Sequence, residues 1–289
     1  EWLFDYAWDQ EVTDVHLWIT KYAQAKTKHH DPIAEEGYRR LIDLVYKDQI
    51  SDVGVGSLVQ TRPALTRIKG HQRPSKYDYN ELTEILSLLL TADEKSLQSY
   101  EYQKDLLVIS KQILDNLIIP VRKNLNQAYV EKDVEELDKQ INIFLGILDD
   151  LDRLLATDTE FMLGKWIHDA RKFGEDSASL ALLEQNARVI ISTWGSEGNN
   201  ITDYGRRDLS GLISSYYKVR WEKFFNLLKT SLEKNIPLDM EAFNKEIAEF
   251  EWGWTKDQTE FDYKPKGNML EVINDIYKKY RPLFEISND

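Results

Sequence analysis

Cysteine is absent from this chain of 289 residues, which excludes disulfide bonds, thiolate metal ligands and a cysteine nucleophile. No apolar run approaches the ~18 residues that a membrane-spanning helix needs. The nucleotide-binding patterns G-x-G-x-x-G and G-x-x-x-x-G-K-[ST] are missing, as is the G-x-S-x-G turn of many serine hydrolases. We find no Gly/Ser-rich linker, low-complexity segment or internal repeat of fixed period. These absences exclude the commonest nucleotide-binding and thiol chemistries, membrane spans and repeat architectures.

Acidic residues outnumber basic ones, with 50 Asp and Glu against 37 Lys and Arg, for a net charge of −13. A chain of this charge repels nucleic-acid phosphates and anionic membrane surfaces, so we expect no nucleic-acid partner. Hydrophobic residues make up 42% and charged residues 30%, which is an ordinary globular composition. The length suits one large helical domain or two smaller ones.

Helical patterns dominate the chain. Asp31, Asp78 and Asp133 each occupy an N-cap position before apolar residues at three- and four-residue spacing. Pro120 is expected to kink or split the helical pattern over 97–130. We predict an all-α fold, a large irregular bundle of about ten helices with two long loops, and no barrel of alternating strands and helices. The later helices are expected over residues 159–173, 177–193, 204–234, 239–251 and 268–281.

The two long loops are expected over residues 50–76 and 252–267. Each contains proline and lacks a clear period, and long ordered loops are often functional or packed against another domain. We treat residues 1–289 as one domain, with a possible weak subdivision near 50–76. The sequence begins at Glu1 without an initiator methionine or a signal-peptide pattern, so we expect a processed or excised fragment.

Neither acidic pairs nor histidines predict a catalytic or metal centre. Neighbouring carboxylates such as Asp149, Asp150 and Asp152 are expected by chance among 50 acidic residues, and a solvated helix face explains them best. The histidines do not form an H-E-x-x-H pattern, and no cysteine assists them. We therefore predict no catalytic residue, no metal and no cofactor; the histidines considered are His16, His29, His30 and His71.

Eight tryptophans stand in this sequence, and one of them differs from the rest in its setting. Trp18, Trp166 and Trp221 lie in helical apolar stripes, where core packing is expected. Trp194 instead lies at a predicted helix end, where an indole is hard to bury and well placed to stack on a sugar ring. From these residues alone, packing and ligand contact both remain open for Trp194.

The loop that follows Trp194 has strong turn signals. Gly195 and Gly198 allow the positive φ angles of a tight turn. Asp203 stands where an N-cap is expected before the next helix. The sequence thus predicts a helix–loop–helix unit that presents Trp194 near its first turn.

Several spaced motifs, spread from about residue 8 to 282, resemble the C-terminal helical domain of glycoside hydrolase family 89, the α-N-acetylglucosaminidases. Together they are specific, although each alone would be weak. They are Phe161-Met162-Leu163-Gly164-Lys165-Trp166, Glu184-Gln185-Asn186-Ala187-Arg188, Thr193-Trp194-Gly195 with Glu197-Gly198-Asn199, Asp203-Tyr204, Gly211-Leu212, Tyr216-Tyr217, Arg220-Trp221, and Ser57-Leu58-Val59 with Arg62-Pro63.

The resemblance implies that this chain is part of a larger retaining glycosidase. In that family, two catalytic glutamates lie on a (β/α)8 barrel, which needs about 250 residues of alternating strands and helices that this chain lacks. The resemblance makes that barrel, within the same polypeptide, and a glycan with terminal α-linked N-acetylglucosamine the expected partners. It places Trp194 at the rim of the substrate pocket, together with Asn200 or Ile201. Exported family members imply a periplasmic or extracellular location.

Two alternatives to this interpretation remain. The chain could be a stand-alone helical module that binds carbohydrate or acts as a scaffold, which its acidic helical composition and loop aromatics would also suit. It could also be a self-contained all-helical hydrolase of the (α/α)6 type that uses carboxylate pairs. Activity of this chain alone would distinguish the hydrolase, and glycan binding by this chain alone would favour the module.

Overall fold

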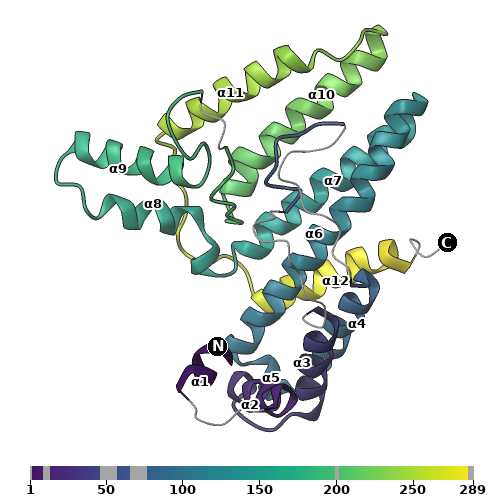
Figure 1. The fold of residues 1–289 in the computed structure, drawn as a ribbon, viewed down its shortest axis with the longest axis vertical. Coiled ribbons are helices and arrows are strands. Elements are labelled where there is room, and N and C mark those ends of the chain that lie inside the picture. The colour runs from purple at the N-terminus through teal and green to yellow at the C-terminus, as the bar shows by residue number, and fades with distance from the viewer. Residues whose placement is uncertain (1, 9–13, 46–56, 66–76, 199–201, 286–289) are drawn as a thin grey trace. The chain divides into compact units, whose positions relative to one another are not determined.

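A computed structural model describes residues 2–8, 14–45, 57–65, 77–198 and 202–285 (Figure 1). The described residues form helices joined by turns and loops, and their one extended pairing is an isolated bridge between Met162 and Ser210. The predicted all-α class is therefore confirmed. None of the helices in these ranges is both long enough and apolar enough to cross a membrane.

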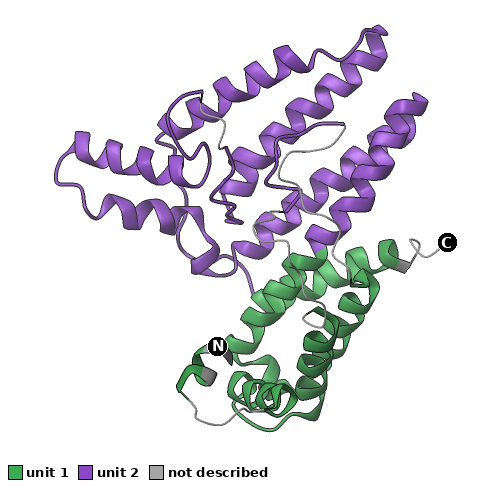
Figure 2. Ribbon diagram, in the orientation of Figure 1, with its two compact units in different colours: residues 1–53, 74–113, 269–289 green, residues 54–73, 114–268 purple. Residues whose placement is uncertain are grey.

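The chain divides into two compact units, and one of the points at which it passes from one unit to the other falls inside a helix (Figure 2). Unit 1 comprises residues 1–53, 74–113 and 269–289, and unit 2 comprises residues 54–73 and 114–268. The long helix α6 (Tyr100–Glu131) contributes residues to both. Residues 57–65 belong to unit 2, and the rest of the 50–76 segment that we singled out as a possible subdivision lies outside the described residues.

Unit 1 is a set of helices around an apolar core supplied mainly by α4, α6 and α12. Leu86, Leu106 and Ile273 are almost fully buried. The Tyr38 hydroxyl donates to Asp105 at 2.8 Å, and that of Tyr102 donates to the Leu89 carbonyl at 2.8 Å. Its helices are α1 (Trp2–Trp8), α2 (Val15–Thr27), α3 (Pro32–Val45), α4 (Tyr79–Leu89), α5 (Glu94–Leu97), the first part of α6, and α12 (Met269–Glu285).

Unit 2 is centred on aromatic packing between α7 and α10. The Phe144 ring lies 4.6 Å from that of Trp221 and 5.2 Å from that of Phe225, and the Trp221 indole donates to the Val59 carbonyl at 3.1 Å. The elements are α7 (Val134–Leu155), the 3-10 turn η1 (Thr159–Phe161), α8 (Leu163–Arg171), α9 (Ser177–Ile190), the π-helical turn η2 (Ile213–Tyr217), α10 (Lys218–Lys234) and α11 (Met240–Lys256).

The three predicted aspartate N-caps are confirmed. Asp31 accepts from the backbone N–H groups of Ile33 and Ala34, and the carboxylates of Asp78 and Asp133 cap α4 and α7. Each cap satisfies N–H groups that the first helical turn leaves without an intrahelical partner. These local hydrogen bonds set the starts of α3, α4 and α7.

Two helix boundaries differ from the local sequence signals. Of the two outcomes predicted for Pro120, a kink or a split, the split does not occur, since α6 runs continuously through it between the buried side chains of Leu117, Ile118 and Val121. The second long loop begins later than predicted, because α11 continues to Lys256. Trp252 and Trp254 are thus helical residues.

The tryptophans predicted to pack in the core do so to different degrees. Trp221 is only 1% exposed, which confirms its core assignment. Trp166 is 36% exposed, and its indole donates to the Ala187 carbonyl at 2.9 Å. Trp18 is partly buried and donates to Asp5. The last two therefore join helices at their edges rather than fill a core.

Candidate functional site

Trp194 lies just beyond the end of α9, in a backbone conformation that is rare for its residue type. The helix begins with a capping box between Asp176 and Ser179. At its other end, the Trp194 N–H donates to the Val189 carbonyl at 2.7 Å, and Trp194 has a φ of 60°. A positive φ is uncommon for a bulky residue, and such strain concentrates at functional sites.

The predicted turn glycines behave differently from each other. Gly198 has a φ of 76°, as predicted, but the other positive φ of this turn falls on Trp194 rather than on Gly195. The positive φ of Trp194 accompanies the hydrogen bond from its N–H back to the end of α9.

The Trp194 ring forms an exposed aromatic pair with Tyr204, from the far limb of the same loop. The ring centroids lie 4.8 Å apart with an interplanar angle of 48°, and the residues are 39% and 63% exposed. Residues 199–201 lie between these limbs and include Asn200 and Ile201, the other two predicted contacts, which lie outside the described residues. Tyr204, the ring partner of Trp194, was not singled out from the sequence, although it belongs to the quoted Asp203-Tyr204 motif.

Asp203 is not the N-cap that the sequence predicts. It has a φ of 65°, its N–H donates to the Ser192 carbonyl at 2.7 Å, and helix begins only at the η2 turn, Ile213–Tyr217. Its carboxylate accepts from Arg220 Nη1 at 3.0 and 2.9 Å. Asp203 therefore ties the loop to α10 instead of starting a helix.

Four charged side chains, which we call the Arg220 network, lie beneath this loop: Arg62, Asp203, Arg220 and Glu251. Arg220 is completely buried and donates to Asp203, to Glu251 at 2.8 Å and to the Gln60 carbonyl at 2.8 Å. Arg62 also pairs with Glu251: its Nε donates at 3.0 Å to Oε1, the oxygen that Arg220 contacts, and its Nη2 donates to Oε2. Two guanidinium groups and two carboxylates thus balance in charge around the two buried members, Arg220 and Glu251, while Arg62 is 35% exposed.

Burial and pairing act in opposite directions on the Arg220 network. Burial disfavours the charged guanidinium, but Asp203 and the other neighbours of Arg220 hold its pKa above the usual value. Burial raises the pKa of Asp203 to about 6, against the attraction of Arg220. The Arg220 guanidinium also lies over the rings of Tyr216 and Tyr217, at 4.6 and 5.1 Å. Arg220 is therefore held from several sides as a permanent cation.

Asp152 does not belong to a solvated helix face, contrary to the sequence interpretation. Its carboxylate accepts from the N–H groups of Gly211 and Ser214, at 2.7 and 3.1 Å, and from the Ser210 hydroxyl. These bonds satisfy the backbone where the chain enters η2. Asp152 is engaged as a cap of this segment, and Asp149 pairs with Lys218.

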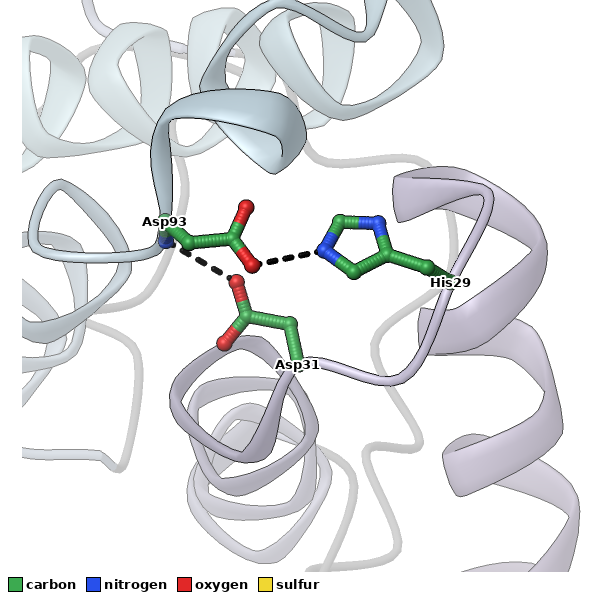
Figure 3. A group of neighbouring side chains, drawn as sticks. All are labelled: His29, Asp31 and Asp93. Carbon is green, nitrogen blue, oxygen red and sulfur yellow. Dashed lines mark hydrogen bonds and ion pairs between the residues drawn. The ribbon is translucent and has the colours of Figure 1, made fainter.

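His29, Asp31 and Asp93 form a compact polar cluster in unit 1 (Figure 3). The His29 Nδ1 faces the Thr27 carbonyl at 2.8 Å, and Nε2 faces Asp93 at 2.6 Å. Since both partners only accept, both ring nitrogens carry hydrogen and neither offers a lone pair to a metal. Asp31 meanwhile accepts from the Asp93 N–H and the Ser96 hydroxyl as well as capping α3. This hydrogen bonding fits a charged imidazole that links the end of α2 to the start of α5, which we call the His29 clasp, better than it fits a metal site.

The clasp makes a pH-dependent prediction. The hydrogen bond to Asp93 raises the pKa of His29, and the bond from His29 lowers that of Asp93. A raised histidine pKa contributes stability below its unfolded value of about 6.5, and this is lost as pH rises through the folded-state pKa. We expect His29→Gln to lower the melting temperature at pH 6 and to approach the wild type at pH 9. An equal deficit at both pH values would show that the pair is not ionic.

Comparison with known proteins places this fold among glycoside hydrolases. Structures of a family 89 glycoside hydrolase from Clostridium perfringens superpose on 99% of this chain with a TM-score of 0.87 at 24% identity, and on 99% with a TM-score of 0.86 at 25% identity. These complexes contain 2-acetamido-1,2-dideoxynojirimycin and PUGNAc, respectively. Another structure of the clostridial enzyme, a variant bound to its substrate GlcNAc-α-1,4-galactose, superposes with a TM-score of 0.87 at 24% identity. The fold is thus that of a helical part of a glycosidase.

Residues 18–279 match the family model of the α-N-acetylglucosaminidase (NAGLU) C-terminal domain, and the chain belongs to this family. It is 29% identical to human α-N-acetylglucosaminidase over 274 residues, which is 94% of this chain and 36% of the human protein. It also covers 33% of the clostridial chain. The chain therefore spans about a third of the length of these relatives, which are larger and contain further domains. The resemblance inferred from the motifs is confirmed.

Proposed function

We propose that this chain forms one wall of the active-site pocket of an α-N-acetylglucosaminidase, and that Trp194 stacks on the terminal N-acetylglucosamine. The observation that carries the proposal is the half-exposed Trp194 ring at a strained backbone position, paired with Tyr204. An aromatic face suits the CH-rich face of a sugar, and strain of this kind persists where the surroundings enforce it.

The chemistry itself lies outside this chain in the proposal. The two catalytic glutamates of a retaining mechanism reside on a (β/α)8 barrel elsewhere in the polypeptide, one as acid/base and the other as nucleophile. Asn200 and Ile201 remain predicted contacts of the same pocket. The substrate complexes of the clostridial relative, with GlcNAc-α-1,4-galactose and with N-acetylglucosamine analogues, support a glycan ending in α-linked N-acetylglucosamine.

Removing the Trp194 ring from the full-length enzyme is expected to lower kcat/KM for an aryl α-N-acetylglucosaminide by about 5- to 150-fold. This corresponds to the ~1–3 kcal/mol by which an aromatic ring stabilises a stacked planar group. Trp8→Ala is the matched control, because Trp8 is 87% exposed on α1, and it should retain wild-type kinetics. Wild-type kinetics for Trp194→Ala, with the variant folded, would remove Trp194 from the pocket.

The 289-residue chain on its own should not hydrolyse the same substrate, because in this proposal the two catalytic glutamates lie on a domain outside it. Calorimetry with free N-acetylglucosamine should likewise show no tight binding, since only one wall of the pocket is present. Hydrolysis by this chain would establish the self-contained hydrolase instead. Tight glycan binding by this chain would establish the stand-alone binding module.

A further inference from the structure

Residues 194–205, which we call the Trp194 loop, are held to the end of α9 at both of their ends. The contacts that hold them lie next to the Trp194–Tyr204 pair in the sequence. The first limb is held by the bond from the Trp194 N–H to Val189. The second limb approaches so closely that a Cβ on Gly205 would lie 2.4 Å from the Ile190 carbonyl oxygen. Between them, the Asp203 N–H reaches back to Ser192. These contacts leave the loop little freedom at its base.

The Arg220 network supplies the side-chain hydrogen bonds that hold this loop. Arg220 donates to both carboxylate oxygens of Asp203, and Arg62 Nη2 donates to the Thr202 hydroxyl at 3.3 Å. Thr202 and Asp203 are the two residues directly before Tyr204, whose ring contacts Trp194. The completely buried Arg220 and the partly buried Arg62 are therefore connected, through residues one or two positions before Tyr204, to the exposed pair of Trp194 and Tyr204.

Stability alone gives a poor account of this arrangement. Replacing a buried ion pair by apolar side chains of similar volume is often neutral or stabilising, so a buried network is weak evidence of a stabilising role. The contact between Arg220 and Asp203, however, is charge-assisted, with Nη1 of Arg220 close to both carboxylate oxygens, and such hydrogen bonds are shorter and stronger than neutral ones. Asp203 also holds a positive φ of 65°, a conformation that sets the direction of the chain into Tyr204.

We propose that Asp203 is a positioning residue of the sugar-binding wall: clamped by Arg220, and supported by the bond between Arg62 and Thr202, it sets the placement of Tyr204 and Trp194. The inference rests on the proposed function of Trp194, and it assigns to the buried ions a role in substrate affinity. Asp203 itself does not touch the sugar.

The test is a mutant cycle in the full-length enzyme, with an aryl α-N-acetylglucosaminide as the substrate. Asp203→Asn keeps the shape of the side chain and a residue type that tolerates positive φ, but it removes the charge that Arg220 clamps. We expect kcat/KM to fall about tenfold or more, mainly through KM. In a Trp194→Ala/Tyr204→Ala background, Asp203→Asn should lower kcat/KM by less than about twofold, because the rings that Asp203 positions are absent.

Asp208→Asn is the matched control, since Asp208 lies five positions further along and its carboxylate accepts from the Gln60 side chain at 2.7 Å. It should leave kcat/KM within about twofold of wild type. If Asp203→Asn does not fold, Thr202→Val takes its place in the same mutant cycle. We then expect a smaller fall in kcat/KM, and this fall must disappear in the Trp194→Ala/Tyr204→Ala background.

Equal losses in both backgrounds would overturn the positioning role, because a purely structural defect does not depend on the rings. If the Trp194→Ala/Tyr204→Ala enzyme itself has wild-type kinetics, the proposed function fails and the inference fails with it. The two failures are thus distinguishable in one set of measurements.

Discussion

Arg188→Met is expected to lower the free energy of unfolding by about 3–5 kcal/mol, the usual effect of removing one partner from a buried ion pair. Arg188 is completely buried, and Glu184, its partner one turn earlier on α9, is 3% exposed. Arg188 donates to Glu184 at 2.7 Å and to the Thr259 carbonyl at 2.9 Å. Methionine fills much of the volume but removes this donor from both acceptors, so that Arg171, 3.4 Å from the second carboxylate oxygen, is the remaining cation beside the buried Glu184.

The same helical spacing elsewhere supplies the control. Lys165 and Asp169 on α8 also form an i,i+4 pair, but their side chains are 41% and 42% exposed. Lys165→Met should change the free energy of unfolding by less than about 0.5 kcal/mol, because exposed pairs are screened by water. Urea denaturation followed by tryptophan fluorescence measures both variants. Equal changes in the free energy of unfolding for the two variants would show that burial does not determine how strongly the Arg188–Glu184 pair stabilises the fold.

Gly164→Ala is expected to destabilise unit 2 by about 3 kcal/mol, at the upper end of what overpacking usually costs. A Cβ at Gly164 would lie 2.2 Å from the backbone oxygen of Asp262 and 2.4 Å from that of Phe261. Backbone atoms cannot rotate away as a flexible side chain can, so α8 and the 261–262 segment must separate. Thermal or urea denaturation of the variant measures the loss.

Gly253→Ala is the matched substitution, within α11, where a Cβ would meet no atom within 4 Å. Alanine is the better helix former, so this variant should be stabilised by about 0.5–1 kcal/mol. The two changes add the same methyl group and should act in opposite directions. A similar destabilisation of both would mean that the close approach at Gly164 is not the cause.

Local chemistry made much of the helical framework predictable. A carboxylate that can reach the first free N–H groups of a helix does so wherever the sequence places it, and Asp31, Asp78 and Asp133 follow this rule. Asp203 has the same local context, yet Arg220, 17 positions away, takes its carboxylate. The difference between the outcomes lies in a tertiary partner that sequence spacing does not reveal.

The candidate site was predictable only in part, for a similar reason. The motif containing Trp194 indicated a turn with an exposed ring, and the structure agrees. The ring partner Tyr204 and the buried support beneath it depend on contacts between distant segments. Glu251 is an example: it stands in a helix of ordinary amphipathic pattern, and only the approach of Arg62 and Arg220 explains its complete burial.

The Arg220 network also sets an order of events during protein synthesis. Arg62 and Glu251 are separated by 189 positions, and Arg220 contacts Gln60 across 160. Long loops of chain must close before such contacts form, which makes them late steps in folding. A ribosome-bound chain that ends before Glu251 carries both limbs of the Trp194 loop but not the acid that joins the two arginines. The Arg220 network is therefore complete only after the part of α11 that contains Glu251 has been synthesised, when most of the family domain already exists.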